Sequence, residues 1–315
     1  MWLYFITMKI FPRLSLPAVL SPMAGVTDIA FRALAKHYGA GLTCTEFVSS
    51  AGLIRGSEKT FAMTLIDPLE KPAAVQLFGN NVEDIIAAAQ MVEHDFDVID
   101  INCGCPAWKV IKTGAGSALL KKPELIAKFV AMLVDSVKKP VTVKIRIGVD
   151  DRHINAVQVA KLVEESGAAA IAVHGRTQEQ GYRGAANWEI IKEVKDAVNI
   201  PVIGNGDVFT PEIFAQRLQE SNVDAIMIAR GAMGNPYIFK QINDYLKRGR
   251  YDLKSGIEQF SDFLPLALKY QLPFSLVKNH ALLFTKGMAN GARLREHISH
   301  CTSVEETASF IEQPC

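Results

Sequence analysis

The feature that most constrains the fold is an alternation of two kinds of segment over the first three quarters of the chain. Short runs rich in apolar and β-branched residues, typical of buried strands, occur at 18–20, 43–48, 73–78, 97–101, 141–147, 169–173, 201–203 and 224–228. Between most of them, apolar residues recur at helical spacing, over 29–38, 82–94, 123–137, 155–166, 187–198 and 211–220. Strands that are apolar along their whole length are typical of a parallel sheet covered by helices.

Eight such alternations within about 200 to 250 residues predict an α/β fold, a closed (β/α)8 TIM barrel. A doubly wound open sheet is the alternative, but the glycine fingerprint expected after its first strand is missing. Two N-cap signals agree with this division into elements: Thr210 precedes Pro211, and Asn235 precedes Pro236. Each pair is expected to begin a helix.

After residue 250 the pattern is helical only, over 257–270, 274–288 and 304–311, with breaks at Pro273, Gly287 and Gly291. We therefore expect a catalytic barrel domain, residues 1–250, and a small helical domain, residues 251–315. The helical part carries a scatter of basic side chains: Lys269, Lys278, His280, Lys286, Arg293, Arg295 and His300. Such a scatter most often belongs to a solvated face.

The composition indicates a globular chain, since 49% of its 315 residues are hydrophobic and 21% are charged. A net charge of +1 gives no overall attraction to polyanions, so a nucleic-acid partner would require basic residues gathered on one face. The 5 cysteines are odd in number and unevenly spaced, which favours a reducing cytoplasm over a disulfide framework.

No segment approaches the roughly 20 apolar residues that span a bilayer, so we expect a soluble protein with no membrane partner. The apolar opening, residues 1–7, is too short for a signal-peptide core. Met8 begins a run that would serve equally well as a start, which leaves open whether residues 1–7 belong to the native protein.

The stretch 98–116 shows how a buried strand delivers polar groups to the rim of such a barrel. Its apolar run contains Asp100 and Asn102, and glycine and Pro106 then forbid continuation of the strand. Cys103 and Cys105 are therefore expected on an irregular turn, where a reactive thiol would be placed. The alternative for either thiol is a small buried hydrophobe, which is how most free cysteines behave.

The carboxyl ends of barrel strands carry the chemistry of this fold, and nearly every end here is polar. In strand order these residues are Pro22, Met23 and Ala24; Glu46; Gln76; Asn102, Cys103 and Cys105; Lys144 and Arg146; His174 and Arg176; Asn205, Gly206 and Asp207; and Arg230 and Gly231. So many polar groups on one rim are difficult to assign to packing alone.

The turns after strands seven and eight, IGNGD and ARGAMGNP, predict a phosphate site, because backbone N–H groups of such turns point at the anion. Lys144 would supply a positive charge to an anionic ring, and His174 a second donor. A flavin fits this set, with Gln76 and the backbone at Met23 and Ala24 holding the remaining polar edge of the ring. Pyridoxal phosphate on a barrel lysine is the rival, disfavoured because Arg146 would place a second charge on the same wall.

A metal site is not predicted. The CGC triplet lacks the second ligand pair that zinc or an iron–sulfur cluster needs, and Cys44 lies at the end of a different strand.

Several motifs together resemble the flavin-dependent tRNA dihydrouridine synthases: SPMAGVTD, VQLFG, DINCGCPAWKV with TGAGSALL, VTVKIRIG, HGRTQEQGYRG, IGNGDV and ARGAMGNPYIF. The resemblance extends from residue 21 to about residue 247. The segment KNHALLFTKGMANGARLR is similar to the helical RNA-binding domain of that family.

The resemblance implies that reduced FMN, recharged by NADPH or NADH, passes a hydride to C6 of a uracil in tRNA, while Cys105 protonates C5 as general acid. It implies a cofactor set of Pro22, Met23, Ala24, Gln76, Lys144, His174, Asn205, Gly206, Asp207, Ala229 and Arg230. It also implies a substrate set: Asn102 at the target base, with Lys109, Arg146, Arg176 and Tyr182 toward the base or the RNA backbone. Cys103 receives no role. Trp108 stands where a basic residue is common in the family, so it either stacks on a base or simply packs.

Two other functions remain open from the sequence. One is an FMN-dependent reductase or dehydrogenase of a free pyrimidine or other small enone, similar to dihydroorotate dehydrogenases. The other is a non-redox RNA-binding or phosphate-sugar barrel. The sequence does not fix which uridine is reduced, the choice between NADPH and NADH, or the oligomeric state.

Overall fold

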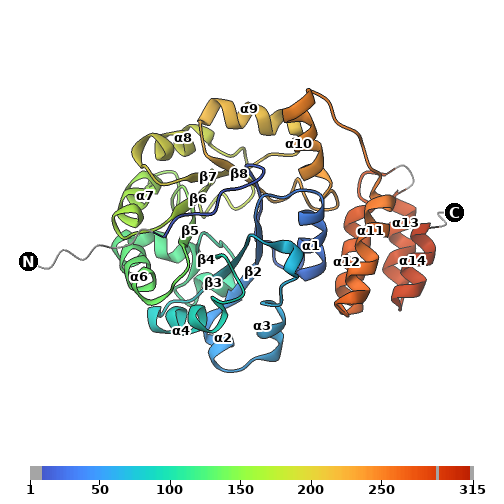
Figure 1. Cartoon of the computed structure of the whole chain (residues 1–315), viewed down its shortest axis with the longest axis horizontal. Helices are drawn as coiled ribbons and strands as arrows, with labels where there is room; N and C mark the ends of the chain where they lie inside the picture. Colours follow the sequence, from blue (N-terminus) through green and yellow to red (C-terminus); the bar gives the residue numbers. More distant parts are fainter. Residues whose placement is uncertain (1–8, 289–290, 313–315) are drawn as a thin grey trace, which may run out of the picture.

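The computed structural model describes residues 9–288 and 291–312, and residues 1–7, whose origin the sequence left open, lie outside this range. Its centre is an 8-stranded parallel sheet in the order β1-β8-β7-β6-β5-β4-β3-β2. A parallel bridge between Val19 and Leu42 links the first strand to the start of the second and closes the sheet into the predicted barrel (Figure 1). The strands are β1 Ala18–Leu20, β2 Thr43–Ser49, β3 Ala73–Phe78, β4 Val98–Cys103, β5 Val141–Arg146, β6 Ala170–His174, β7 Val202–Asn205 and β8 Ala225–Ile228.

Helices surround the barrel, as the alternating pattern predicted. They are α1 Ile29–His37, α2 Ser50–Ile54, α3 Glu58–Ala62, η1 Pro68–Glu70, α4 Val82–Val92, α5 Trp108–Ile111, η2 Gly116–Lys121, α6 Pro123–Ser136, α7 Ala156–Glu165, α8 Trp188–Ala197, α9 Pro211–Ser221 and α10 Ile238–Arg248. Four more form the helical region: α11 Gly256–Lys269, α12 Phe274–Phe284, α13 Gly291–His300 and α14 Val304–Glu312.

The two N-cap predictions have opposite outcomes. Thr210 caps α9, since its side chain accepts a hydrogen bond from the backbone N–H of Ile213. The prediction for Asn235 is wrong: α10 begins at Ile238 and has no side-chain cap. The Asn235 amide instead binds Gln241 and Gln259, which ties the turn after β8 to the helical region.

The apolar side chains form two layers. A small cluster fills the barrel interior: Val19, Leu42, Cys44, Ala74, Val98, Ala172, Ile203, Ala225 and Met227. A larger cluster lies between the strands and the surrounding helices and continues without a break into α11–α14. The barrel therefore shares one core with the helical region.

Helix α11 packs on α1, and α12 contacts α1 through aromatic side chains. Figure 1 shows these helices on the side of the barrel that carries α1. The His280 ring stacks on Phe31 with centroids 5.1 Å apart and lies 4.4 Å from the ring of Phe263. His280 Nε2 also lies 2.6 Å from Oδ2 of Asp28, whose Oδ1 caps α1. The domain boundary at residue 250 stays a prediction. Through these contacts, helices α11 and α12 help to stabilise α1 and the barrel.

Within the described residues, no helix combines the length and the apolar character needed to cross a bilayer.

We predict that Phe263→Ala destabilises the whole protein. The Phe263 side chain is fully buried, and replacing a buried phenylalanine by alanine costs about 3–5 kcal/mol. Chemical denaturation should show one cooperative transition shifted by this amount. Leu268→Ala on the same helix, where the leucine is 56% exposed, is the matched control and should change the free energy of unfolding by less than about 0.5 kcal/mol. Two transitions, with only one of them shifted, would contradict a shared core.

Candidate active site

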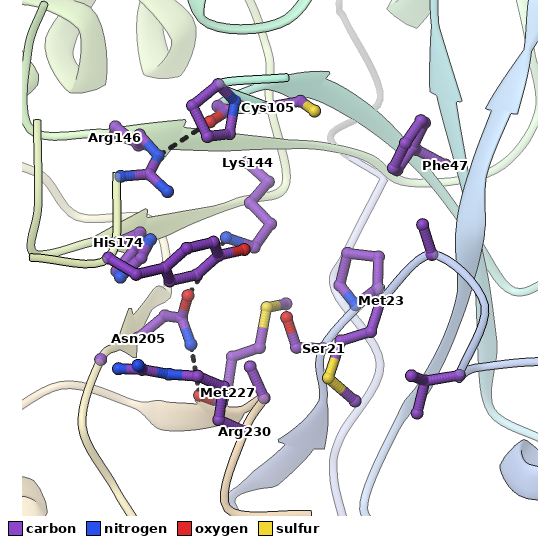
Figure 2. A pocket seen from close by; sticks show the side chains of 18 of the residues that line it. Ser21, Met23, Phe47, Cys105, Lys144, Arg146, His174, Asn205, Met227 and Arg230 are labelled. Carbon is purple, nitrogen blue, oxygen red and sulfur yellow. Dashed lines mark hydrogen bonds between the residues drawn. The ribbon is translucent and has the colours of Figure 1, made fainter. Parts of the chain in front are cut away.

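A cavity of about 450 Å³ opens at the carboxyl ends of the strands, and all residues predicted to bind the cofactor line it (Figure 2). These residues are Pro22, Met23, Ala24, Gln76, Lys144, His174, Asn205, Gly206, Asp207, Ala229 and Arg230. Three predicted substrate residues, Asn102, Arg146 and Tyr182, and the predicted general acid Cys105 line it as well. Lys109 and Arg176 do not.

One wall of the cavity is cationic. Lys144, on β5, donates to Asn205 Oδ1 at 3.2 Å, and Asn205 in turn donates to the carbonyl of Met227 at 2.7 Å (Figure 2). Burial, together with the nearby Arg146, lowers the pKa of Lys144 to about 8, so the ammonium is still largely charged at pH 7. An anionic group placed against this wall would stabilise the charged form.

His174, on β6, lies beside the same cations but does not add to their charge. Burial and the positive charges of Lys144 and Arg146 lower the pKa of His174 to about 2. The imidazole is therefore neutral at physiological pH. It can offer one N–H donor and one acceptor, rather than the two donors of an imidazolium.

Asp207 organises the turn after β7. Its backbone has φ +52°, and its carboxylate binds Nη2 of Arg230 and Nη2 of Arg176, both at 2.7 Å. Burial alone would raise the pKa of Asp207. These hydrogen bonds and the charges of the two arginines outweigh burial and lower the pKa below its ordinary value. The carboxylate thus holds the Arg230 guanidinium at the cavity.

Arg176, a predicted substrate residue, lies inside the protein beside the cavity. Its side chain is only 2% exposed, and beyond Asp207 it donates to the backbone carbonyls of Arg183 and Gly184. These bonds make Arg176 a support of the loop that carries Tyr182. The sequence placed Arg176 correctly near a strand end but did not indicate how many internal acceptors surround it.

Cys105 lies on the turn after β4, and two side chains hold this turn from opposite sides. Asn102 Oδ1 accepts the backbone N–H groups of Gly104 at 3.2 Å and Cys105 at 2.9 Å. The carbonyl of Cys105 accepts from both N and Oγ of Ser117. Position 116 favours glycine, because the Cβ of any other residue would lie only 2.8 Å from that carbonyl oxygen. Ser117 belongs to the TGAGSALL motif, whose sequence does not indicate this contact.

The three cysteines near the barrel centre differ in access. Cys44 and Cys103 are buried in the core, whereas Cys105 is half-buried and lines the cavity. Burial raises the pKa of the Cys105 thiol, and the positive charges of Arg146 and Lys144 offset this only in part. The group is therefore a neutral thiol at pH 7, able to donate a proton.

Aromatic side chains mark the cavity mouth. Tyr182 is 63% exposed, and the guanidinium groups of Arg230 and Arg146 lie 5.3 and 5.7 Å from its ring centre. Arg230 also lies 5.5 Å from the ring of Phe209, a cavity residue that sequence reasoning missed. Its position two residues after Asp207 was the available signal.

The short helix α5 presents Trp108 and Lys109 to solvent outside the cavity lining, and Trp108 is 72% exposed. The Trp108 ring therefore does not pack into the core. Among the described residues, no group of three or more His, Cys, Asp or Glu side chains is arranged to hold a metal ion.

We predict that alkylation by iodoacetamide in the native state is selective for Cys105 over Cys44 and Cys103, and slow. Because the thiol pKa is raised, the labelling rate at pH 8 should be below that of a free cysteine and should increase up to and beyond pH 9. Peptide mass spectrometry at a series of pH values measures this. Rapid labelling at pH 7 would show that Cys105 is a thiolate and not a neutral acid.

Comparison with known proteins shows the family. The dihydrouridine synthase family model matches residues 19–314. A probable tRNA-dihydrouridine synthase of Rickettsia conorii is 40% identical over 292 residues, covering 90% of this chain and 88% of its own length. The tRNA-dihydrouridine synthase B of Pseudomonas aeruginosa is 44% identical over 234 residues, covering 74% and 70%. A solved structure of histamine dehydrogenase from Rhizobium sp. 4-9, with a TM-score of 0.57 at 15% identity over 84% of this chain and 51% of that chain, shares the fold. The chain belongs to the dihydrouridine synthase family.

Proposed function

We propose that the protein is a tRNA-dihydrouridine synthase, which reduces the C5–C6 double bond of uridine in tRNA with FMN as cofactor and NADPH or NADH as electron donor. The observation that carries this proposal is the convergence of the neutral Cys105 thiol and the buried Lys144 cation on one cavity at the barrel mouth, in a chain of this family.

The residues of the cavity fit a flavin mononucleotide. The turns with Gly206 and Arg230 provide a cation and backbone N–H groups suited to a phosphate, and Lys144 provides a charge suited to an electron-rich ring edge. Gln76 and the loop Met23–Ala24 would hold the remainder of the ring. When bound and reduced, the flavin supplies a hydride to C6 of the uracil.

Cys105 would supply the proton. Its thiol protonates C5 as the hydride reaches C6, so that the double bond is saturated and a thiolate is left. Arg146 and Lys144 lie close enough to lower the pKa of this thiol, so the same charges stabilise the thiolate. Solvent then returns the proton.

The RNA must deliver its target base into the cavity, because a base within a helical stack is out of reach. Asn102 and Arg146 would face that base. The exposed rings of Tyr182 and Trp108 are suited to stack on neighbouring bases, and the exposed Lys109 to pair with phosphate. We place the enzyme in the cytoplasm, where its tRNA substrate is found, with no membrane or metal partner.

We predict that Cys105→Ala binds flavin and tRNA but loses about 100-fold or more of its turnover, since a general acid contributes at least this factor. Cys103→Ala, the same substitution on a buried thiol two residues away, is the matched control and should retain turnover. The measurement is dihydrouridine content of an unmodified tRNA transcript by nucleoside mass spectrometry. An unimpaired Cys105→Ala enzyme would show that another group supplies the proton.

A further inference from the structure

A buried carboxylate that the proposed mechanism does not use lies directly beneath the cavity. Asp100, on β4, is 5% exposed and is in register with Gln76 on β3 and Thr142 on β5. Its Oδ2 accepts from Gln76 Nε2 at 2.6 Å, and its Oδ1 accepts from the Thr142 hydroxyl at 2.6 Å. Burial raises the pKa of Asp100, while both hydrogen bonds and the charge of Lys144 lower it in part.

The hydrogen bonds continue from Gln76 through Asn102 to the turn that carries Cys105. Asn102 Nδ2 donates to Gln76 Oε1 at 2.6 Å, and Asn102 Oδ1 accepts the backbone N–H groups of Gly104 and Cys105. Every bond in this chain therefore runs in one direction, from the backbone donors of the Cys105 turn, through two amides, to the carboxylate of Asp100.

The two ends of the chain fix its direction. Backbone N–H groups can only donate, and an ionised carboxylate can only accept. Asn102 must therefore turn its oxygen to the Cys105 turn and its nitrogen to Gln76, and Gln76 must turn its nitrogen to Asp100. Without an acceptor at position 100, the nitrogen of Gln76 would lose its partner, and the Gln76 amide would be held only through its oxygen, by the bond from Asn102.

We propose that Asp100 is a positioning residue, which holds the side-chain amide of Gln76, and through it supports that of Asn102, so that both present a hydrogen-bond donor to the ligand in the cavity. Each amide nitrogen carries two hydrogens, and the chain uses one of them, so one N–H remains on each side chain. Gln76 and Asn102 both line the cavity. The groups they meet must then be acceptors, such as the ring carbonyls of a flavin or a uracil. This inference rests on the proposed function for the identity of the ligand.

The first test compares flavin affinity of Asp100→Leu and Asp100→Asn, measured by quenching of flavin fluorescence. Leucine removes the acceptor and leaves a buried amide unpaired, so the Kd for FMN should rise about 10-fold or more. Asparagine can turn its oxygen to Gln76 and its nitrogen to Thr142, so its Kd should stay within about 3-fold of wild type. Asp97→Leu, at the residue directly before β4 and outside the cavity lining, is the control for loss of an aspartate.

A second test separates positioning from mere support of the fold. Gln76→Glu places two carboxylates against each other and should weaken both stability and flavin binding. The double variant Gln76→Glu with Asp100→Asn restores a donor–acceptor pair, with the donor now at position 100, but leaves no free N–H at position 76. Its thermal stability should return to near wild type, while its Kd for FMN stays about 10-fold higher or more.

Wild-type affinity in Asp100→Leu would overturn the inference, and so would full recovery of flavin affinity in the double variant. A wild-type protein that binds no FMN under the same conditions would instead contradict the proposed function. The two failures are therefore distinguishable.

Discussion

The site depends on keeping a lysine ammonium enclosed at the mouth of the barrel. Burial of Lys144 costs free energy, as the lowering of its pKa shows, and its hydrogen bond to Asn205 compensates only in part. The neighbouring His174 is neutral, while Arg146 adds a second positive charge to the same wall. The protein's own groups therefore polarise the cavity toward an anion. Such preorganisation is how a fold stabilises charge that develops during a reaction.

The helical region contributes to this arrangement from outside the barrel. Asn279 on α12 donates to the carbonyl of Gly25 at 2.9 Å, next to the Met23–Ala24 loop that lines the cavity, and the adjacent His280 is paired with Asp28. Removing residues after 250 would therefore disturb the cavity as well as any RNA surface. Deletion of these helices cannot by itself distinguish a tRNA enzyme from a reductase of small molecules, whereas point substitutions of exposed basic residues on them can.

The sequence predicts the barrel and most residues that line the cavity. Parallel strands bring their carboxyl ends to one rim, and the polar residues at those ends can be identified from the sequence. It was insufficient where a role depends on partners distant in the chain. The sequence does not show that Arg176 donates to Asp207 and to backbone carbonyls of the loop after β6. Asp100 was read as part of a strand, since its bonds to Gln76 and Thr142 exist only after three strands pair. The helical pattern does not predict α13, because its first residue is Gly291, and glycine is typical of a break between helices.

The measurement that tests the central claim most directly is the visible spectrum of the purified protein under anaerobic conditions, with NADPH and then unmodified tRNA added to the same cuvette. The account predicts a flavin band that bleaches with NADPH and recovers when tRNA is added. Bleaching without recovery would contradict tRNA as the acceptor and would favour reduction of a free pyrimidine. Absence of any flavin band, even after reconstitution with FMN, would contradict the account as a whole.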